Sequence, residues 1–307
     1  MDFQSATPKS GRRQFMNTAA GGLSGLALGG PAAAQGALAK AGTVRDCFWV
    51  FCCPVNSDYP NIKRRSVMSP AEFAFYLAVP NIIMVQIIPS EEHNDPFTAW
   101  EPPFDQYAIG LRPLKRVVWS LISSHYPRSK EENPQIIDLA KRTPNIVGVF
   151  LDDFFTNRKD RVAILSLDEL KAFRRDLNSS SNKLDIYMTV YTTQLEYPVR
   201  EYMELMDVLT LWTWKPGDLV HLEENLKKTR ALAPKCRIML GCYVVDFTEK
   251  RSTPIDAMKY QCETGLRWLR EGRIEGMIFL ANTVADVGYE AVDWTRDWIE
   301  KVGDTKL

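Results

Sequence analysis

Eight short runs of apolar residues, most of them rich in β-branched and aromatic side chains, follow one another between residue 47 and residue 281. Strands that are apolar on both faces are typical of a parallel sheet covered by helices. The sequence therefore predicts eight strands, which span residues 47–53, 82–88, 116–122, 146–151, 184–191, 208–214, 237–245 and 276–281.

Polar segments with helix-start signals stand between most of these runs. Ser69 and Ser166 are each followed three residues later by a glutamate, Glu72 and Glu169, which is the arrangement of a capping box. Residues 254–272 carry the longest amphipathic pattern, and the glycine that closes it favours a helix end there. We expect a helix at each of these places.

This alternation predicts a (β/α)8 TIM barrel in residues 46–307, because eight strand-and-helix units match that fold in number and in length. Residues 94–113 are rich in proline and have little helical periodicity, so we expect a long loop with a short helix there. A doubly wound sheet is the alternative, but no GxGxxG motif follows a predicted strand.

The N-terminal segment resembles a twin-arginine export signal. Arg12 and Arg13 precede the weakly apolar residues 18–30, and small residues as at a signal-peptidase site stand just before residue 35. The sequence predicts a signal peptide at residues 1–34, a linker at residues 35–45, and export by the twin-arginine machinery to the periplasm or the cell exterior. A disordered basic N-terminus or an uncleaved anchor is the alternative, although the run is too short and glycine-rich for a stable membrane span.

The charge and composition of the chain argue against nucleic-acid binding and against a second membrane-spanning segment. Removal of the signal takes away three basic side chains and one acidic side chain, which leaves a net charge of −2. A nucleic-acid-binding protein would need a strongly basic face, so we expect no nucleic-acid partner. No second apolar stretch is long enough to span a membrane. None of the six cysteines forms a CxxC pair, and we expect buried thiols; disulfides with partners that the sequence does not assign are the alternative.

Three aspartates stand where predicted strands end, and that end of a TIM barrel holds the active site. Asp152 and Asp153 close the fourth apolar run, and Asp246 follows the seventh. Adjacent strand residues point to opposite sides, so we expect one of the pair to face the barrel mouth while the other braces a loop. The structural alternatives are a helix cap or loop salt bridge for the pair and a turn-forming role for Asp246.

Other residues at strand ends are candidates for substrate binding. Trp214, Tyr191 and Tyr243 offer aromatic faces that can stack on sugar rings, whereas Trp212 suits core packing. The further polar candidates are Glu92, His125, Glu196 and Asn282.

The segments at residues 148–155, 241–247 and 273–280 resemble a group of uncharacterised exported bacterial proteins with a twin-arginine signal and a glycoside-hydrolase-like (β/α)8 barrel. The first segment is also partly similar to the DxxDxDxE signature of the chitinase-type family, but it lacks the terminal glutamate. The resemblance implies a barrel and a carbohydrate substrate, and it brings no established reaction.

The leading hypothesis is an exported glycoside hydrolase without a cofactor or metal. Glycosidic hydrolysis needs one carboxyl group as a general acid and another as nucleophile or base. Asp152 or Asp153 would be the acid, with Asp153 preferred, and Asp246 would be the partner carboxylate. The alternatives are a non-catalytic carbohydrate-binding barrel and a divalent-metal-dependent sugar isomerase or epimerase with the ligands Glu92, His125, Asp153 and Glu196.

Changing Arg12 and Arg13 together to lysine tests the export hypothesis. We expect the double variant to stay unprocessed in the cytoplasm, because the arginine pair is the recognised feature of this signal. Immunoblotting of cell fractions measures the processed and unprocessed forms. Normal processing of the double-lysine variant would exclude the twin-arginine assignment.

Overall fold

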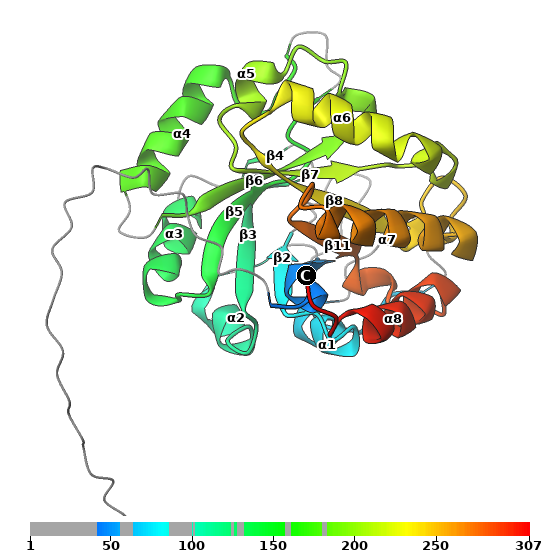
Figure 1. The fold of residues 1–307 in the computed structure, drawn as a ribbon. Helices are drawn as coiled ribbons and strands as arrows, with labels where there is room; N and C mark the ends of the chain where they lie inside the picture. The colour runs from blue at the N-terminus through cyan, green and yellow to red at the C-terminus, as the bar shows by residue number, and fades with distance from the viewer. Residues whose placement is uncertain are drawn as a thin grey trace, which may run out of the picture. The chain divides into compact units, whose positions relative to one another are not determined.

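The computed structural model describes residues 42–55, 64–85, 100, 102–123, 126–127, 132–156, 161–179 and 183–307. The expected signal peptide and most of the expected linker lie outside the described residues. The described chain forms a ring of strands with helices on its outer side (Figure 1).

Eight parallel strands close into a barrel. The first strand pairs with both the second and the last, and the second also pairs with the third, so the ring is complete. This confirms the predicted (β/α)8 barrel, and each predicted apolar run contains or overlaps one barrel strand. The barrel strands are β1 (Phe48–Cys52), β2 (Asn81–Met84), β3 (Arg116–Ser123), β5 (Ile146–Leu151), β6 (Asp185–Tyr191), β7 (Val208–Trp212), β8 (Arg237–Tyr243) and β11 (Gly276–Leu280).

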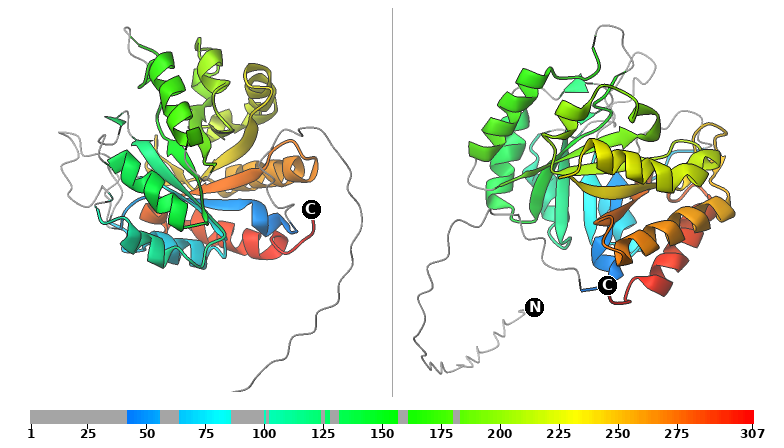
Figure 2. Two further views of the ribbon diagram at one scale, coloured as in Figure 1. Left: turned by 90° about the vertical axis from the view of Figure 1, so that its left-hand side faces the viewer. Right: turned by 45° about the horizontal axis from the view of Figure 1, so that its top comes forward.

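One α-helix follows each barrel strand and packs on the outside of the ring, as the two rotated views show (Figure 2). Three short strands add to the loops: β4 (Tyr126–Pro127), β9 (Val245–Asp246) and β10 (Arg251–Ser252). The 3-10 turns are η1 (Val44–Cys47), η2 (Thr192–Gln194), η3 (Pro216–His221) and η4 (Asn282–Val284). The helices are α1 (Pro70–Tyr76), α2 (Asp105–Gly110), α3 (Glu132–Arg142), α4 (Leu167–Ser179), α5 (Arg200–Met203), α6 (Leu222–Leu232), α7 (Ile255–Arg270) and α8 (Glu290–Val302).

The predicted helix signals act as expected. The Ser69 backbone N–H donates to Glu72 Oε2 at 2.7 Å, and the Glu72 N–H donates back to Ser69 Oγ at 3.3 Å, so a capping box opens α1. An equivalent box opens α4. Gly272 ends the segment after α7 with a φ of +66°, a conformation that glycine adopts without strain. Within residues 94–113 the described part forms only the six-residue α2, as the proline content indicated.

Two apolar layers hold the barrel together. The larger lies between the strands and the helices and includes Phe48, Phe73, Phe279 and Trp298. All six cysteines are buried and free, which confirms the prediction of buried thiols. In the described part of the chain, no helix has the length and apolarity needed to cross a membrane.

The second layer fills the barrel interior, where large rings lie beside positions that have no side chain. Trp212 is buried, its Nε1 donates to Thr210 Oγ1 at 2.9 Å, and its indole lies across Gly241 of the next strand. A Cβ at Gly241 would come within 2.1 Å of the indole. Glycine is therefore required here by a close approach, and the ring fills the volume that a side chain would otherwise take.

Ion pairs close the opposite end of the barrel, where the strands begin. Arg237 of β8 pairs with Asp185 of β6 at 2.5 Å and with Glu275 at 3.3 Å. Arg116 of β3 lies over the Trp49 ring, 4.6 Å from the centroid. This end of a TIM barrel serves stability rather than catalysis, and these contacts fit a stabilising role.

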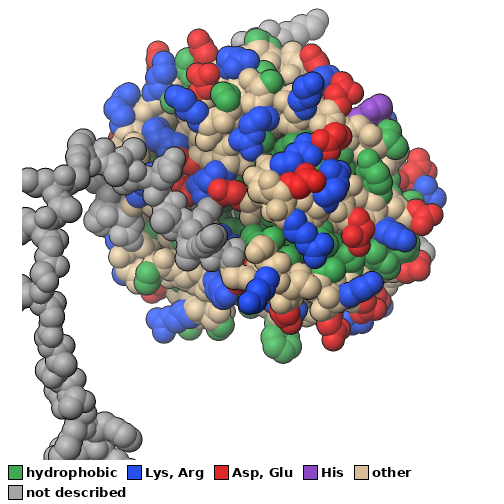
Figure 3. Space-filling model, in the orientation of Figure 1, with side chains coloured by type: hydrophobic (Ala, Val, Ile, Leu, Met, Phe, Trp, Pro, Cys, Tyr) green, Lys and Arg blue, Asp and Glu red, His purple; other side chains and the backbone are tan. Residues whose placement is uncertain are grey.

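The outer surface carries both signs of charge. Figure 3 shows acidic and basic side chains interspersed over the face that it presents.

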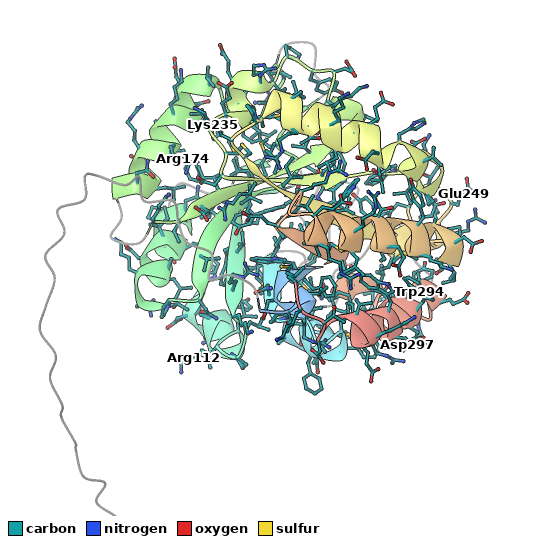
Figure 4. All side chains as sticks on the ribbon, in the orientation of Figure 1. Arg112, Arg174, Lys235, Glu249, Trp294 and Asp297 are labelled. Atoms are coloured by element: carbon teal, nitrogen blue, oxygen red, sulfur yellow. The ribbon has the colours of Figure 1, made fainter. Side chains whose placement is uncertain are left out.

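Arg174 on α4, labelled in Figure 4, stabilises the fold through an ion pair. It pairs with Asp207 at 2.6 Å and so connects the helix to the start of β7.

The packing of Trp212 on Gly241 predicts a non-additive pair of substitutions. Trp212→Ala should lower the free energy of unfolding by about 3–5 kcal/mol, because a large buried ring is lost. Gly241→Ala should lower it by about 1–3 kcal/mol, because the new methyl group overlaps the indole. In the double variant the overlap is gone, so its loss should be smaller than the sum of the two. Urea unfolding measures all three, and strictly additive losses would contradict this packing.

Candidate active site

Asp152 lies at the C-terminal end of β5 and is buried in the barrel mouth. Its backbone N–H donates to the Ile122 carbonyl at 2.9 Å, which continues the pairing of β5 with β3. Its Oδ1 accepts a hydrogen bond from Thr189 Oγ1 at 2.7 Å, and the residue is 8% exposed. The side chain therefore points across to β6, on the inner side of the barrel.

Asp153 follows in a left-handed backbone conformation with a φ of +48°. Aspartate tolerates this region better than most residues, and the turn leaves its side chain half-buried beside β6. Its Oδ1 accepts a hydrogen bond from the Tyr191 hydroxyl at 2.7 Å. The two neighbouring carboxyls are thus held by two residues of the same strand, Thr189 and Tyr191.

Two buried phenylalanines fix the turn that carries these acids. Phe154 and Phe155 are at most 1% exposed, and both contact the Tyr202 ring with centroids 6.0 and 6.1 Å away. The Ile164 N–H donates to the Phe154 carbonyl at 2.9 Å, and Phe155 pairs with Ala163 in an isolated bridge. Buried rings and backbone hydrogen bonds therefore hold the turn that carries Asp152 and Asp153, as the preorganisation of catalytic groups requires.

The environment of Asp152 favours its protonated form. Burial and, next, the negative charge of Asp153 raise the pKa of Asp152 well above its usual value. The hydrogen bond from Thr189 lowers this pKa but is a smaller effect. Burial likewise raises the pKa values of Tyr191 and Tyr243, so both hydroxyls keep their protons at neutral pH. The net effect of these surroundings favours the acid form of Asp152.

Four aromatic rings, Tyr191, Trp214, Tyr243 and Phe247, form a continuous aromatic wall beside the acid pair. The Trp214 and Phe247 rings stack at 26° with centroids 5.6 Å apart. Trp214 meets Tyr191 and Tyr243 edge to face at 6.0 and 5.6 Å. Because Tyr191 also bonds Asp153, the wall and the carboxyl belong to one connected site.

The two tryptophans of this region differ as the sequence indicated. Trp212 is 1% exposed and packs in the barrel, with the Tyr243 ring 5.0 Å away. Trp214 is 43% exposed, although the wall covers part of its ring. An exposed indole that neighbouring rings hold in place is suited to stacking on a flat ligand face.

Asp246 has a local structural role. It is 4% exposed, and its Oδ1 accepts the backbone N–H groups of Thr248 and Glu249 at 3.1 and 3.2 Å. These bonds close the turn of the β9–β10 hairpin, in line with the turn-forming alternative. Nothing in these contacts joins Asp246 to Asp153, so the sequence-based pairing of the two has no support in the geometry.

The other sequence candidates divide into two groups. Glu92 and His125 lie outside the described residues. Glu196 is on the surface, 76% exposed at its side chain, and pairs with Lys228 at 3.0 Å. Asn282 is fully buried, and its amide bonds both backbone groups of Cys53 at 2.8 and 3.0 Å, so it joins the last strand to the first rather than facing a ligand.

Thr189 and Phe247 are site residues that the sequence reasoning missed. Thr189 could have been found from the alternation of side chains along a strand. It stands two positions before Tyr191 and must therefore face the same side. Phe247 gave no comparable signal, because its place in the wall depends on the path of the β9–β10 turn. Among the described residues, no group of three or more potential ligands stands close enough to hold a metal ion.

Comparisons with known proteins support the fold. No protein-family model matches the sequence, and no curated protein is similar to it. A solved structure from Bacteroides thetaiotaomicron, assigned as an α-L-fucosidase, has a TM-score of 0.53 at 11% identity and covers 88% of this chain and 99% of its own. An α-amylase from Anoxybacillus has a TM-score of 0.50 at 13% identity, with 84% of this chain and 78% of its own covered. At such low identity these similarities establish the (β/α)8 barrel alone.

The raised pKa of Asp152 predicts how the stability of an Asp152→Asn variant depends on pH. Between the pKa of the unfolded chain, about 3.9, and the higher folded value, folding retains a proton that the unfolded chain releases. The parent therefore loses stability as pH rises through this window, at a limiting slope of about 1.4 kcal/mol per pH unit. The uncharged amide avoids this loss. In urea unfolding from pH 4 to pH 8, the free energy of unfolding of Asp152→Asn should therefore rise relative to that of the parent as the pH rises.

The control is Asp168→Asn, at a side chain that is 97% exposed on α4. Its stability difference from the parent should stay flat over the same range. A flat difference for Asp152→Asn as well would contradict a retained proton on Asp152.

Proposed function

We propose that this protein is an exported carbohydrate-active enzyme that hydrolyses glycosidic bonds with the carboxyl pair Asp152 and Asp153. The observation that carries the proposal is the connected site, in which one carboxyl with a raised pKa, a second carboxyl and an aromatic wall meet at the C-terminal end of the barrel strands. Both structures compared above are named as enzymes that act on carbohydrates, which agrees with the proposal.

The two carboxyls would divide the work according to their surroundings. Adjacent acids whose environments push their pKa values apart are a recurring basis for acid and base roles. Asp152, which retains its proton, donates it to the glycosidic oxygen as the bond to the anomeric carbon breaks. Asp153 faces the positive charge that develops on the sugar ring and serves as nucleophile or base toward water. The oxygen of water ends on the anomeric carbon, and its proton returns to the carboxyl pair.

The remaining residues would position these groups and the substrate. Thr189 orients Asp152 and Tyr191 orients Asp153, each through one hydrogen bond of 2.7 Å. Trp214 would stack on the apolar face of a sugar ring next to the reacting bond. In this proposal Asp153 takes the role of partner carboxylate that the sequence gives to Asp246, and Asp152 is the acid, because Asp246 is bonded to the backbone of its own turn.

Rates on a panel of aryl glycosides test these roles. Asp153→Asn should lower kcat by about 10²- to 10⁴-fold, and asparagine preserves both side-chain shape and the left-handed backbone. Asp152→Asn should lose as much on substrates with poor leaving groups. It should lose much less on dinitrophenyl glycosides, because such leaving groups depart without a proton. Trp214→Ala should raise KM with little change in kcat.

Asp168→Asn again serves as the matched surface control. A loss in Asp246→Asn as large as in Asp153→Asn would restore the pairing first expected from the sequence. If the parent binds sugars in a Trp214-dependent manner but cleaves none of the panel, the barrel is a carbohydrate-binding protein and the hydrolase proposal fails.

A further inference from the structure

Two buried cysteines are neighbours between β8 and α7. Cys242 and Cys262 are each 0% exposed, and both belong to the apolar layer between the strands and the helices. Burial and, next, a hydrogen bond with the Cys242 thiol raise the pKa of the Cys262 thiol. The two thiols are therefore in direct contact, although they belong to different elements of the fold.

Contacts on both sides of this thiol pair fix how α7 lies on β8. Gln261, which precedes Cys262, donates from Nε2 to the carbonyl of Tyr243, which follows Cys242, at 3.2 Å. One turn further along α7, a Cβ at Gly265 would lie 3.0 Å from Leu240 Cδ2, so the helix approaches the strand closely. The contact between the two thiols thus follows from the register of the helix on the strand.

Cys236 and Cys52 make a different kind of contact. Cys236 Sγ donates to the Met203 and Met206 carbonyls at 3.2 Å each, and Cys52 Sγ donates to the Pro70 carbonyl at 3.9 Å. A carbonyl oxygen accepts a hydrogen bond from a thiol but forms no bond with it on oxidation. Two neighbouring thiols, in contrast, can be oxidised to a disulfide.

We propose that Cys242 and Cys262 form a disulfide bond when this chain folds in an oxidising compartment. Both thiols are free in the structure, and their contact means that the bond requires little movement of the backbone. Disulfides persist in extracellular and periplasmic compartments, which an exported protein enters. The inference goes beyond the proposed hydrolase and does not depend on it.

The oxidant is a low-molecular-weight or protein disulfide. One cysteine thiolate attacks a sulfur of the oxidant and releases one thiol, and the second cysteine thiolate then displaces the other. Two S–H bonds are lost and one S–S bond forms, while the two electrons and two protons end on the two thiols of the oxidant. Because both cysteines are fully buried, we expect this reaction during folding, before α7 covers β8.

The bond would join α7 to the strand that leads into the aromatic wall. Tyr243 follows Cys242 directly, and the segment that the bond closes contains the β9–β10 hairpin with Phe247. Closing this segment restricts the unfolded chain more than the folded one. The bridged protein should therefore be more stable than the reduced protein.

Refolding of the full chain in a glutathione buffer tests the proposal. Protein unfolded in urea is refolded with reduced and oxidised glutathione, so that other pairings can exchange, and its remaining thiols are alkylated before digestion with trypsin. Mass spectrometry should show that two of the six thiols are lost and that the peptides of residues 238–250 and 260–267 are linked. The thermal midpoint should lie about 4–8 °C above that of protein refolded with dithiothreitol.

Three alanine variants serve as controls. Cys242→Ala and Cys262→Ala should each abolish both the linked peptide and the rise in midpoint. Cys236→Ala is the matched control, because it removes a buried thiol outside the pair and should retain both effects. Should the variants fail to fold, the peptide map of the parent decides.

Two results would overturn the proposal. One is an oxidised parent that keeps six alkylated thiols, and the other is a parent whose link joins different cysteines. A correctly linked protein that melts no higher than the reduced protein would overturn the stabilising role. These readouts do not involve glycoside cleavage, so a failure of the proposed hydrolase would leave them unchanged.

Discussion

The packing of the Trp212 indole against Gly241 is the interaction on which the arrangement of side chains at the barrel mouth depends. The ring takes the volume of the missing side chain, and its nitrogen is bonded to Thr210, so it has one position. Tyr243 lies 5.0 Å from it and in turn contacts Trp214. The exposed Trp214 is therefore connected through Tyr243 to a buried ring, and the β9–β10 hairpin adds the Phe247 ring that stacks on it.

Packing also fixes the positions of Asp152 and Asp153, which follow β5 and contact β6. Asp152 and Asp153 are set by a turn with two buried phenylalanines behind it, and by two hydroxyl groups from β6 in front of it. Because both hydroxyls lie on one face of a single strand, the two carboxyls are held in fixed relation to each other. Burial, and next the closeness of Asp153, raise the pKa of Asp152 and so favour its protonated form.

Much of the fold could be predicted from the sequence, because hydrophobic periodicity, the composition of strands and the capping of helices are local features of the chain. The capping boxes at Ser69 and Ser166 are examples, since each involves residues only three apart. The site was predictable only in part. Strand ends pointed to Asp153 and Trp214, which Tyr191 connects in the structure, but the roles of Asp246 and Asn282 depend on where backbone groups lie. Asn282 bonds Cys53 from 229 positions away, and no local pattern encodes such a contact.

The bridge between Phe155 and Ala163 has a consequence for how this protein can change over evolution. It joins the two ends of the segment between them, with further bonds from Thr156 to the Val162 and Arg161 backbone. Asp152 and Asp153 stand before the bridge, so residues inserted between Phe155 and Ala163 would leave the paired ends in place. Each doubling of loop length then costs only about 0.6 kcal/mol. Insertions between the two halves of the bridge would therefore leave Asp152 and Asp153 in their positions.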